Sequence, residues 1–211
     1  MKRRMACLTL ILAAAAAAAR GQVRSGTVEI NPYAGYLFGG NFGDTVVEFS
    51  PYNVRVDDDA IYGGRIGFNV TSLFELEFEY GYDKTQLVLD NDTAFVPDSR
   101  IGDVTLQYFM GYATFNFGYG RLVPYFTIGG GAANIKPEIA DFATVSDTRV
   151  TAGIGGGIKY FFDPHFALRI DGRAYSTYLG DTTVLCGPYY TCTQTNWLTN
   201  FSANGGLIVA F

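Results

Sequence analysis

The stretch FELEFEYGY, residues 74–82, places a glutamate at every second position between aromatic and apolar residues. Successive residues of a helix are rotated by about 100°, so a helix would scatter Glu75, Glu77 and Glu79 around its circumference. A strand alternates its side chains strictly between two faces, and one face here would be apolar and the other anionic. The stretch therefore predicts a β-strand whose two faces meet very different surroundings.

The start of the chain has the order of a secretory signal peptide. Three basic residues at positions 2–4 precede a run from Met5 to Ala19 that is apolar except for Thr9. The run is shorter than the roughly 20 residues of a spanning helix. We predict a signal peptide over 1–21 and a mature domain over 22–211. Ala19 offers a competing cleavage site, and an uncleaved helical anchor is the alternative.

The charge of the predicted mature chain is strongly negative. Residues 1–21 hold four of the 15 Lys and Arg residues and none of the 20 acids, so 11 bases and 20 acids remain, a formal charge of −9. This excess argues against nucleic acid and anionic lipid surfaces as electrostatic partners.

Alternating segments recur along the rest of the chain, separated by connectors of two lengths. The connectors at 69–73, 118–121 and 163–165 are tight, whereas the others are long, polar and rich in aspartate. This alternation predicts an all-β fold, an eight-stranded antiparallel up-and-down transmembrane β-barrel with periplasmic turns and termini and external loops. The inward phase of the fourth segment stays open. The expected strands are 27–38, 60–70, 74–82, 103–117, 122–135, 148–162, 166–179 and 197–211, and the long connectors are about 39–59, 83–102, 136–147 and 180–196.

The glutamates of residues 74–82 then belong inside the barrel. A cation on the lipid face costs about 2–4 kcal/mol at the bilayer midplane and an acid somewhat less. Three such acids would remove much of a net stability of about 5–15 kcal/mol. Pairing across the 69–73 turn brings Arg65 opposite Glu77 or Glu79. The predicted interior charge network consists of Glu29, Arg65, Glu75, Glu77, Glu79, Lys159, Arg169, Asp171 and Arg173.

Two cysteines, Cys186 and Cys192 in CGPYYTC, lie close together in the last long connector. In an exported protein this spacing predicts a loop disulfide. A metal site is the alternative, but it would need further ligands nearby.

We predict no catalytic residue, metal ligand or cofactor. The glycine strings at 129–131 and 155–157 lack the Lys-Ser/Thr of a phosphate-binding loop, and the loop aspartates lack EF-hand spacing. The single histidine, His165, lies in a predicted turn, and no nucleophile–base pair stands out.

Several stretches resemble a known family. PYFTIGGGAA at 124–133, the glycine- and aromatic-rich 151–175 and the terminal GLIVAF make the chain similar to the small OmpA-type and OmpX-like outer-membrane β-barrels. The resemblance implies the outer membrane of a Gram-negative-type bacterium, with outer-membrane lipid and lipopolysaccharide as partners. It also implies that Leu207, Val209 and Phe211 form the C-terminal signal shown to the barrel-assembly machinery.

The expected role is a membrane anchor or structural element whose surface loops meet external partners in adhesion or interaction. Eight strands leave an interior just wide enough for side chains to fill. A narrow or gated pore for water, ions or small solutes is one alternative, and a lipid-modifying enzyme is another.

Overall fold

The computed structural model describes the backbone of residues 23–39, 52–56, 58–91, 99–118, 120–138, 147–187 and 190–211. Side chains are described over 23–39, 58–85, 103–118, 120–136, 147–180 and 197–211. The predicted signal peptide lies outside these residues and stays a prediction. None of the described residues forms a helix that is long and apolar enough to cross a membrane.

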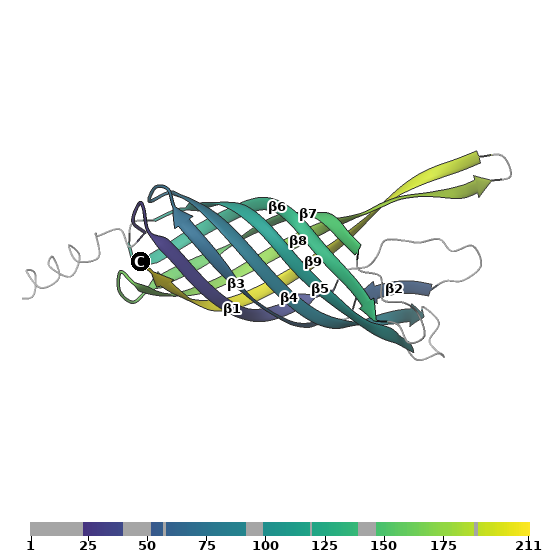
Figure 1. The fold of residues 1–211 in the computed structure, drawn as a ribbon, viewed down its shortest axis with the longest axis horizontal. Helices are drawn as coiled ribbons and strands as arrows, with labels where there is room; N and C mark the ends of the chain where they lie inside the picture. Colours follow the sequence, from purple (N-terminus) through teal and green to yellow (C-terminus); the bar gives the residue numbers. More distant parts are fainter. Residues whose placement is uncertain are drawn as a thin grey trace, which may run out of the picture.

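The described chain is built from antiparallel strands that wind around a common axis (Figure 1). Their long side-by-side pairing is the expected result of alternating sequences joined by tight turns. The strands are β1 (Val28–Phe38), β2 (Tyr52–Val56), β3 (Asp59–Asn69), β4 (Phe74–Asn91), β5 (Ser99–Asn116), β6 (Leu122–Glu138), β7 (Asp147–Phe161), β8 (Phe166–Gly187) and β9 (Tyr190–Ala210).

Eight of these strands close into a barrel. The order is β4-β3-β1-β9-β8-β7-β6-β5, and pairing of β4 with β5 closes the circle. The short β2 pairs with β4 at Leu87–Asn91, beyond the last β3 partner at Asp83, so it continues the line of β3. The eight-stranded antiparallel barrel is therefore confirmed.

The strands run farther toward the long connectors than the sequence predicted. β4 continues to Asn91 and β5 begins at Ser99, so much of the expected 83–102 connector is strand. Most of the expected 180–196 connector is likewise strand, because β8 and β9 stay paired as an arm that projects from the barrel (Figure 1). Once two strands are paired, their hydrogen-bond ladder can continue into water, where polar side chains cost little.

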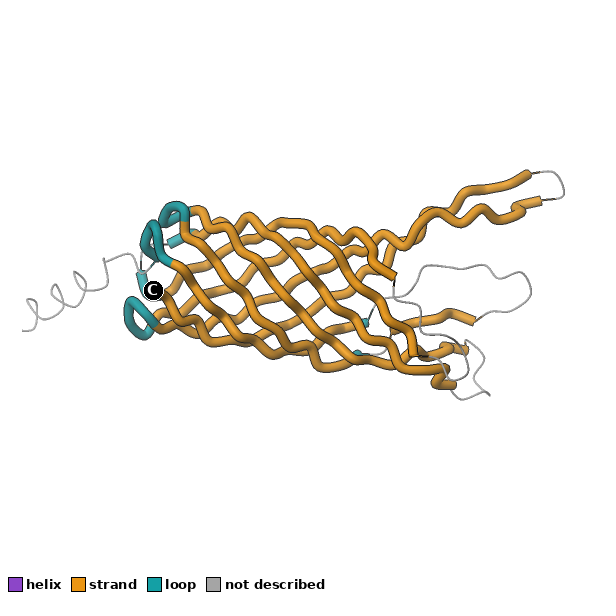
Figure 2. The backbone as a smooth tube through the Cα atoms, viewed as in Figure 1, coloured by secondary structure: helices purple, strands orange, loops and turns teal. Residues whose placement is uncertain are grey.

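The three tight connectors lie at one end of the barrel, together with the C-terminus (Figure 2). In the β7–β8 turn, the Asp163 carboxylate accepts hydrogen bonds from the backbone N–H groups of His165 and Phe166, at 2.7 and 3.0 Å. In the β3–β4 turn, the Thr71 hydroxyl accepts from Leu73 and Phe74. We call this the turn end and the opposite end the loop end.

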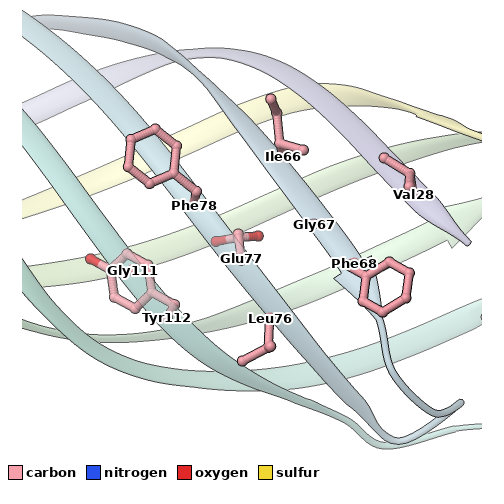
Figure 3. A pocket seen from close by; sticks show the side chains of 9 residues that line it. All are labelled: Val28, Ile66, Gly67, Phe68, Leu76, Glu77, Phe78, Gly111 and Tyr112. Atoms are coloured by element: carbon pink, nitrogen blue, oxygen red, sulfur yellow. The ribbon is translucent and has the colours of Figure 1, made fainter. Parts of the chain in front are cut away.

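The outer wall is apolar, and residues 74–82 of β4 show why. Leu76 and Phe78 are 52% and 51% exposed on the outer face of β4, whereas Glu75 and Glu79 are 0% exposed. Leu76 and Phe78 border a shallow outer groove of about 510 Å³ in the wall, with Gly67 and Gly111 among the residues that line it (Figure 3).

The fourth barrel strand, whose phase the sequence left open, points its even-numbered residues inward. Tyr108, Met110 and Tyr112 of β5 are buried, whereas Phe109 and Phe115 are exposed on the outer wall. The two faces look alike in sequence because this strand packs against apolar groups both inside the barrel and outside it.

Candidate functional site: the interior of the barrel

Most of the described inward-facing side chains fall into three layers along the barrel axis. Strand β8 shows the order: Ala167 lies in an apolar layer at the turn end, Arg169–Arg173 in a charged layer, and Tyr175 in an apolar and aromatic layer. The turn-end cluster consists of Val23, Val123, Phe161, Ala167, Ile208 and Ala210. The loop-end cluster consists of Tyr33, Leu37, Ile61, Val104, Leu106, Tyr108, Met110, Tyr112, Ala133, Tyr175 and Leu198.

The charge network lies between these clusters and contains all nine residues named from the sequence. Five carboxylates and four cations come together there, and each of the nine side chains is at most 5% exposed. Buried charges of this kind are tolerated only when they are paired and hydrogen-bonded.

Nearest the turn end, one lysine bridges two acids. The ammonium of Lys159 lies 2.7 Å from the carboxylate of Glu29 and 2.6 Å from that of Glu75. The amide of Asn69 donates to the other oxygen of Glu29 at 2.8 Å, and the amide of Asn116 donates to Glu75 at 3.5 Å. These contacts join β1, β4 and β7 inside the barrel.

Two arginines of β8 reach across the barrel to the glutamates of β4. Arg173 donates to Glu79 and to Glu77, at 2.6 Å each, and Arg169 also pairs with Glu77. In the circular strand order three strands separate β4 from β8 on either side. These ion pairs therefore connect opposite walls.

Arg65 and Asp171 complete the network. The guanidinium of Arg65 binds both oxygens of Asp171, at 2.7 and 3.2 Å, and its Nε donates to Glu79 at 3.2 Å. The register places Arg65 directly opposite Glu79 on the neighbouring strand. Asp171 also lies 3.2 Å from Arg169 and 3.4 Å from Arg173, so it touches three cations.

Tyrosines that the sequence did not assign to the network hold its arginines in place. The hydroxyl of Tyr125 accepts from Arg169 at 2.7 Å and donates to Asp171 at 2.9 Å. The guanidinium carbons of Arg65, Arg169 and Arg173 lie 3.9, 4.4 and 4.6 Å from the ring centres of Tyr33, Tyr125 and Tyr112. Each cation thus gains an aromatic face in addition to its carboxylates.

These tyrosines had only a partial signal in the sequence. Alternation in the expected strand 27–38 places Tyr33 on the face of Glu29. Tyr112 lies in the strand of open phase, and Tyr125 stands between Pro124 and Phe126. A tyrosine also suits a membrane interface, so its residue type alone does not separate inside from outside.

Inward-facing glycines leave room for these large side chains. A Cβ added at Gly155 would lie 2.8 Å from Cγ of Arg173, and one at Gly157 would lie 2.7 Å from Cβ of Asp171. The glycine strings that could suggest a phosphate-binding loop therefore line strand walls beside the charge network.

The remaining residues named from the sequence lie elsewhere. His165 is exposed in the β7–β8 turn at the turn end. The side chains of Cys186 and Cys192 lie outside the described residues, so the disulfide stays a prediction. Leu207 and Phe211 are exposed on the outer wall and Val209 is half-buried. Phe211 exchanges backbone hydrogen bonds with Val28 at 2.9 and 3.2 Å, and the assembly signal stays a prediction.

A closed antiparallel barrel with an apolar outer wall and a filled, charged interior defines the class of transmembrane β-barrels. The family model for the outer membrane protein beta-barrel domain matches residues 5–203, so the chain belongs to this family. Membership confirms the family resemblance and implies the outer membrane of a Gram-negative bacterium.

Solved structures of this class share the fold. OprG of Pseudomonas aeruginosa aligns with a TM-score of 0.64 and 11% identity, over 90% of this chain and 99% of that chain. Neisserial surface protein A aligns with a TM-score of 0.57 and 14% identity, over 89% of this chain and 100% of that chain. At such identities the likeness concerns the fold alone. Among curated proteins, no sequence matches this chain.

Proposed function

We propose that the protein is a closed barrel that anchors in the outer membrane and presents its loop end to external partners. The observation that carries this proposal is the filling of the interior. The charge network lies between two apolar clusters, and Val123, Phe161, Leu37 and Leu106 in those clusters are 0% exposed. Apolar layers at both ends oppose a continuous file of water or ions.

This arrangement distinguishes an anchor from a pore. We expect the refolded protein to give no conductance steps above baseline in planar lipid bilayers. The double variant Leu106→Ala/Leu198→Ala is compared with the wild-type protein in the same bilayers. It shortens two side chains of the loop-end cluster and leaves the charge network intact. Steady, reproducible steps from the wild-type protein would instead assign it to the narrow pores.

The part of the molecule best placed to meet a partner is the projecting arm. Beyond Thr177, β8 has no pairing with β7, and before Phe201, β9 has no pairing with β1. The described arm is therefore a two-stranded ribbon attached to a rigid barrel. We propose that it lies outside the cell with the other long connectors, while the turn end and the C-terminus face the periplasm.

Deletion of residues 181–196 tests this role. The shortened protein is expected to fold and insert as before, because the charge network lies in the barrel, but to lose attachment of expressing cells to host-cell or matrix surfaces. An epitope inserted in the arm should be reached by antibody on intact cells, whereas one placed in the β7–β8 turn should not. Equal attachment by both proteins would contradict an interaction role for the arm.

The outer wall accounts for the remaining proposed partners. Its apolar face contacts outer-membrane lipid and lipopolysaccharide, and the C-terminal residues Leu207, Val209 and Phe211 are proposed to bind the barrel-assembly machinery during insertion. We assign no catalytic residue. Unchanged lipid A mass spectra from cells with and without the protein are expected, and a new lipid A species would favour the lipid-modifying alternative.

A further inference from the structure

Two carboxyl groups face the inside of the barrel at its loop end, outside the charge network. Asp59 begins β3. Asp83, on the neighbouring strand β4, lies opposite Ile61 of β3 in the strand register. Alternation places Asp59 and Asp83 on the inward face, as diagonal neighbours across adjacent strands. The Cα atoms of such neighbours lie about 7–8 Å apart, so two aspartates can converge on one ion.

Among the residues that the structure describes, none provides a partner for the charge of Asp83. Its side chain is 0% exposed, and neither carboxylate oxygen has a hydrogen-bond partner in the described structure. An ionised carboxylate buried in this way is strongly unfavourable unless a positive group compensates it. In the charge network, by contrast, every acid touches at least one Lys or Arg.

The described cations nearby are already engaged elsewhere. Lys84 lies on the outer face of β4 and pairs with Asp103 at 3.4 Å. Arg149, on the inward face of β7, pairs with Asp147, two residues before it on the same strand. Arg65 binds Glu79 and Asp171. Lys136 of β6 lies opposite Thr105 on the outer face. Neither oxygen of Asp83 has a hydrogen-bond partner among the described residues, and none of the described ion pairs includes Asp83, so its charge is left without compensation there.

Asp59 lies between the buried carboxyl group of Asp83 and the loop end of the barrel. Its side chain is half-buried, and its Oδ1 accepts from the backbone N–H of Ala60 at 2.6 Å. The other oxygen, Oδ2, is left for a ligand. A buried acid beside a half-buried acid gives a site that an ion can enter from the loop end.

We propose that Asp59 and Asp83 bind a hard divalent cation, Ca²⁺ or Mg²⁺, at the loop end of the barrel. Such cations take oxygen ligands at about 2.0–2.6 Å, and water completes their coordination. Within the described residues, no group of three or more His, Cys, Asp or Glu side chains is arranged to hold a metal ion. A site with two carboxylates therefore depends on water, and we expect an affinity in the range of about 10⁻⁴–10⁻³ M, as in extracellular modules.

The test measures unfolding of the full refolded chain in urea, with chelator, with millimolar CaCl₂ or MgCl₂, and with NaCl at matched ionic strength. The wild-type midpoint is expected to rise with the divalent salt only. Asp83→Asn, which keeps the shape and removes the charge, should abolish this rise and exceed the wild-type midpoint in chelator. Asp59→Asn should weaken the apparent affinity at least tenfold. Asp103→Asn, an acid on the outer face, is the control and should respond as the wild type does.

Three results would overturn the site. One is a wild-type midpoint that neither Ca²⁺ nor Mg²⁺ changes, as expected if the Asp83 carboxyl group is simply protonated. Another is a full response in Asp83→Asn, which would place the ion on acids of the long connectors. The third is a full response in Asp59→Asn. Because Asp59 is half-buried, this last variant keeps the proposal falsifiable even if Asp83→Asn does not fold.

Discussion

Arg65 shows how a single side chain connects several strands of the barrel. From β3 its guanidinium pairs with Glu79 on β4 and with Asp171 on β8, and it lies over the ring of Tyr33 on β1. The planar fork of a guanidinium can hold two carboxylates and stack on a ring at the same time, which a lysine ammonium cannot do.

Replacement of Arg65 by alanine is expected to lower the free energy of unfolding by about 3–5 kcal/mol, because removing one partner of a buried ion pair leaves uncompensated carboxylates. Urea unfolding of the refolded protein measures this change. Ile66→Val, one position along on the outer face, is the control and should stay within about 0.5 kcal/mol of the wild type. Equal midpoints for Arg65→Ala and wild type would contradict a structural role for the network.

At this scale the sequence predicted which way a side chain points better than what it touches. Strict alternation was enough to place Glu75, Glu77 and Glu79 on one face. The partners of Glu77 lie 92 and 96 residues away on the opposite wall, and no local pattern shows which strands will face each other after closure.

Among the elements, the packing of β7 against β8 depends on glycines of β7, which have no side chain. The inward glycines of β7 lie beside the charged side chains of β8. They leave space for the charge network at this part of the wall. Gly155 faces Arg173 and Gly157 faces Asp171 in the strand register.

Replacement of Gly157 by alanine is expected to cost about 1–3 kcal/mol, the usual range for overpacking. The added methyl group would overlap the carbonyl oxygen of Ile170 and lie 2.7 Å from Cβ of Asp171. Gly205→Ala is the matched control, because a Cβ there meets nothing within 4 Å. Thermal unfolding of both variants gives the comparison, and a Gly157→Ala protein as stable as Gly205→Ala would refute the packing argument.

The arm formed by β8 and β9 carries the predicted disulfide. The backbone register opposes Leu185 to Thr191 and Val184 to Cys192, with an irregularity between Leu185 and Gly187. Alkylation followed by mass spectrometry, without reductant, should find Cys186 and Cys192 joined in protein exported to an oxidising compartment. Reduction is expected to speed proteolysis of the arm and leave the barrel resistant. Two free thiols in exported protein would exclude the bond.

Among the strands, the turn-end boundaries followed from sequence and the loop-end boundaries did not. Tight turns such as 163–165 mark where a strand must end. Beyond the membrane the ladder can continue through polar residues, so composition alone does not show where β4 or β8 stops. The sequence does not show which face of β5 points inward, because its inward face is also apolar and belongs to the loop-end cluster.

For the whole molecule, we expect hydrocarbon to surround the outer wall. Spin labels at positions 76 and 78 should be reached by quenchers dissolved in the bilayer, whereas labels at 77 and 79 should be shielded. The exposures of Leu76 and Phe78, against the burial of Glu77 and Glu79, motivate this expectation. The reverse pattern would show that the charged face meets lipid and would overturn the assignment.

The closed architecture followed from the sequence because eight alternating segments and two connector lengths leave few other topologies. The three interior layers did not follow from it. Alternation puts Leu37 on the face of Glu29, whereas Leu106 lies in the strand whose phase stayed open. Only the closed barrel brings the two together in the loop-end cluster.

The ion pairs between β4 and β8 join residues 92–96 positions apart. A sheet that entered the bilayer with only half of its strands would therefore expose unpaired carboxylates or guanidinium groups to the hydrocarbon core. We therefore expect partly inserted intermediates to be high in free energy and insertion to be nearly concerted, with the open strand edge sheltered until the final strand pairs.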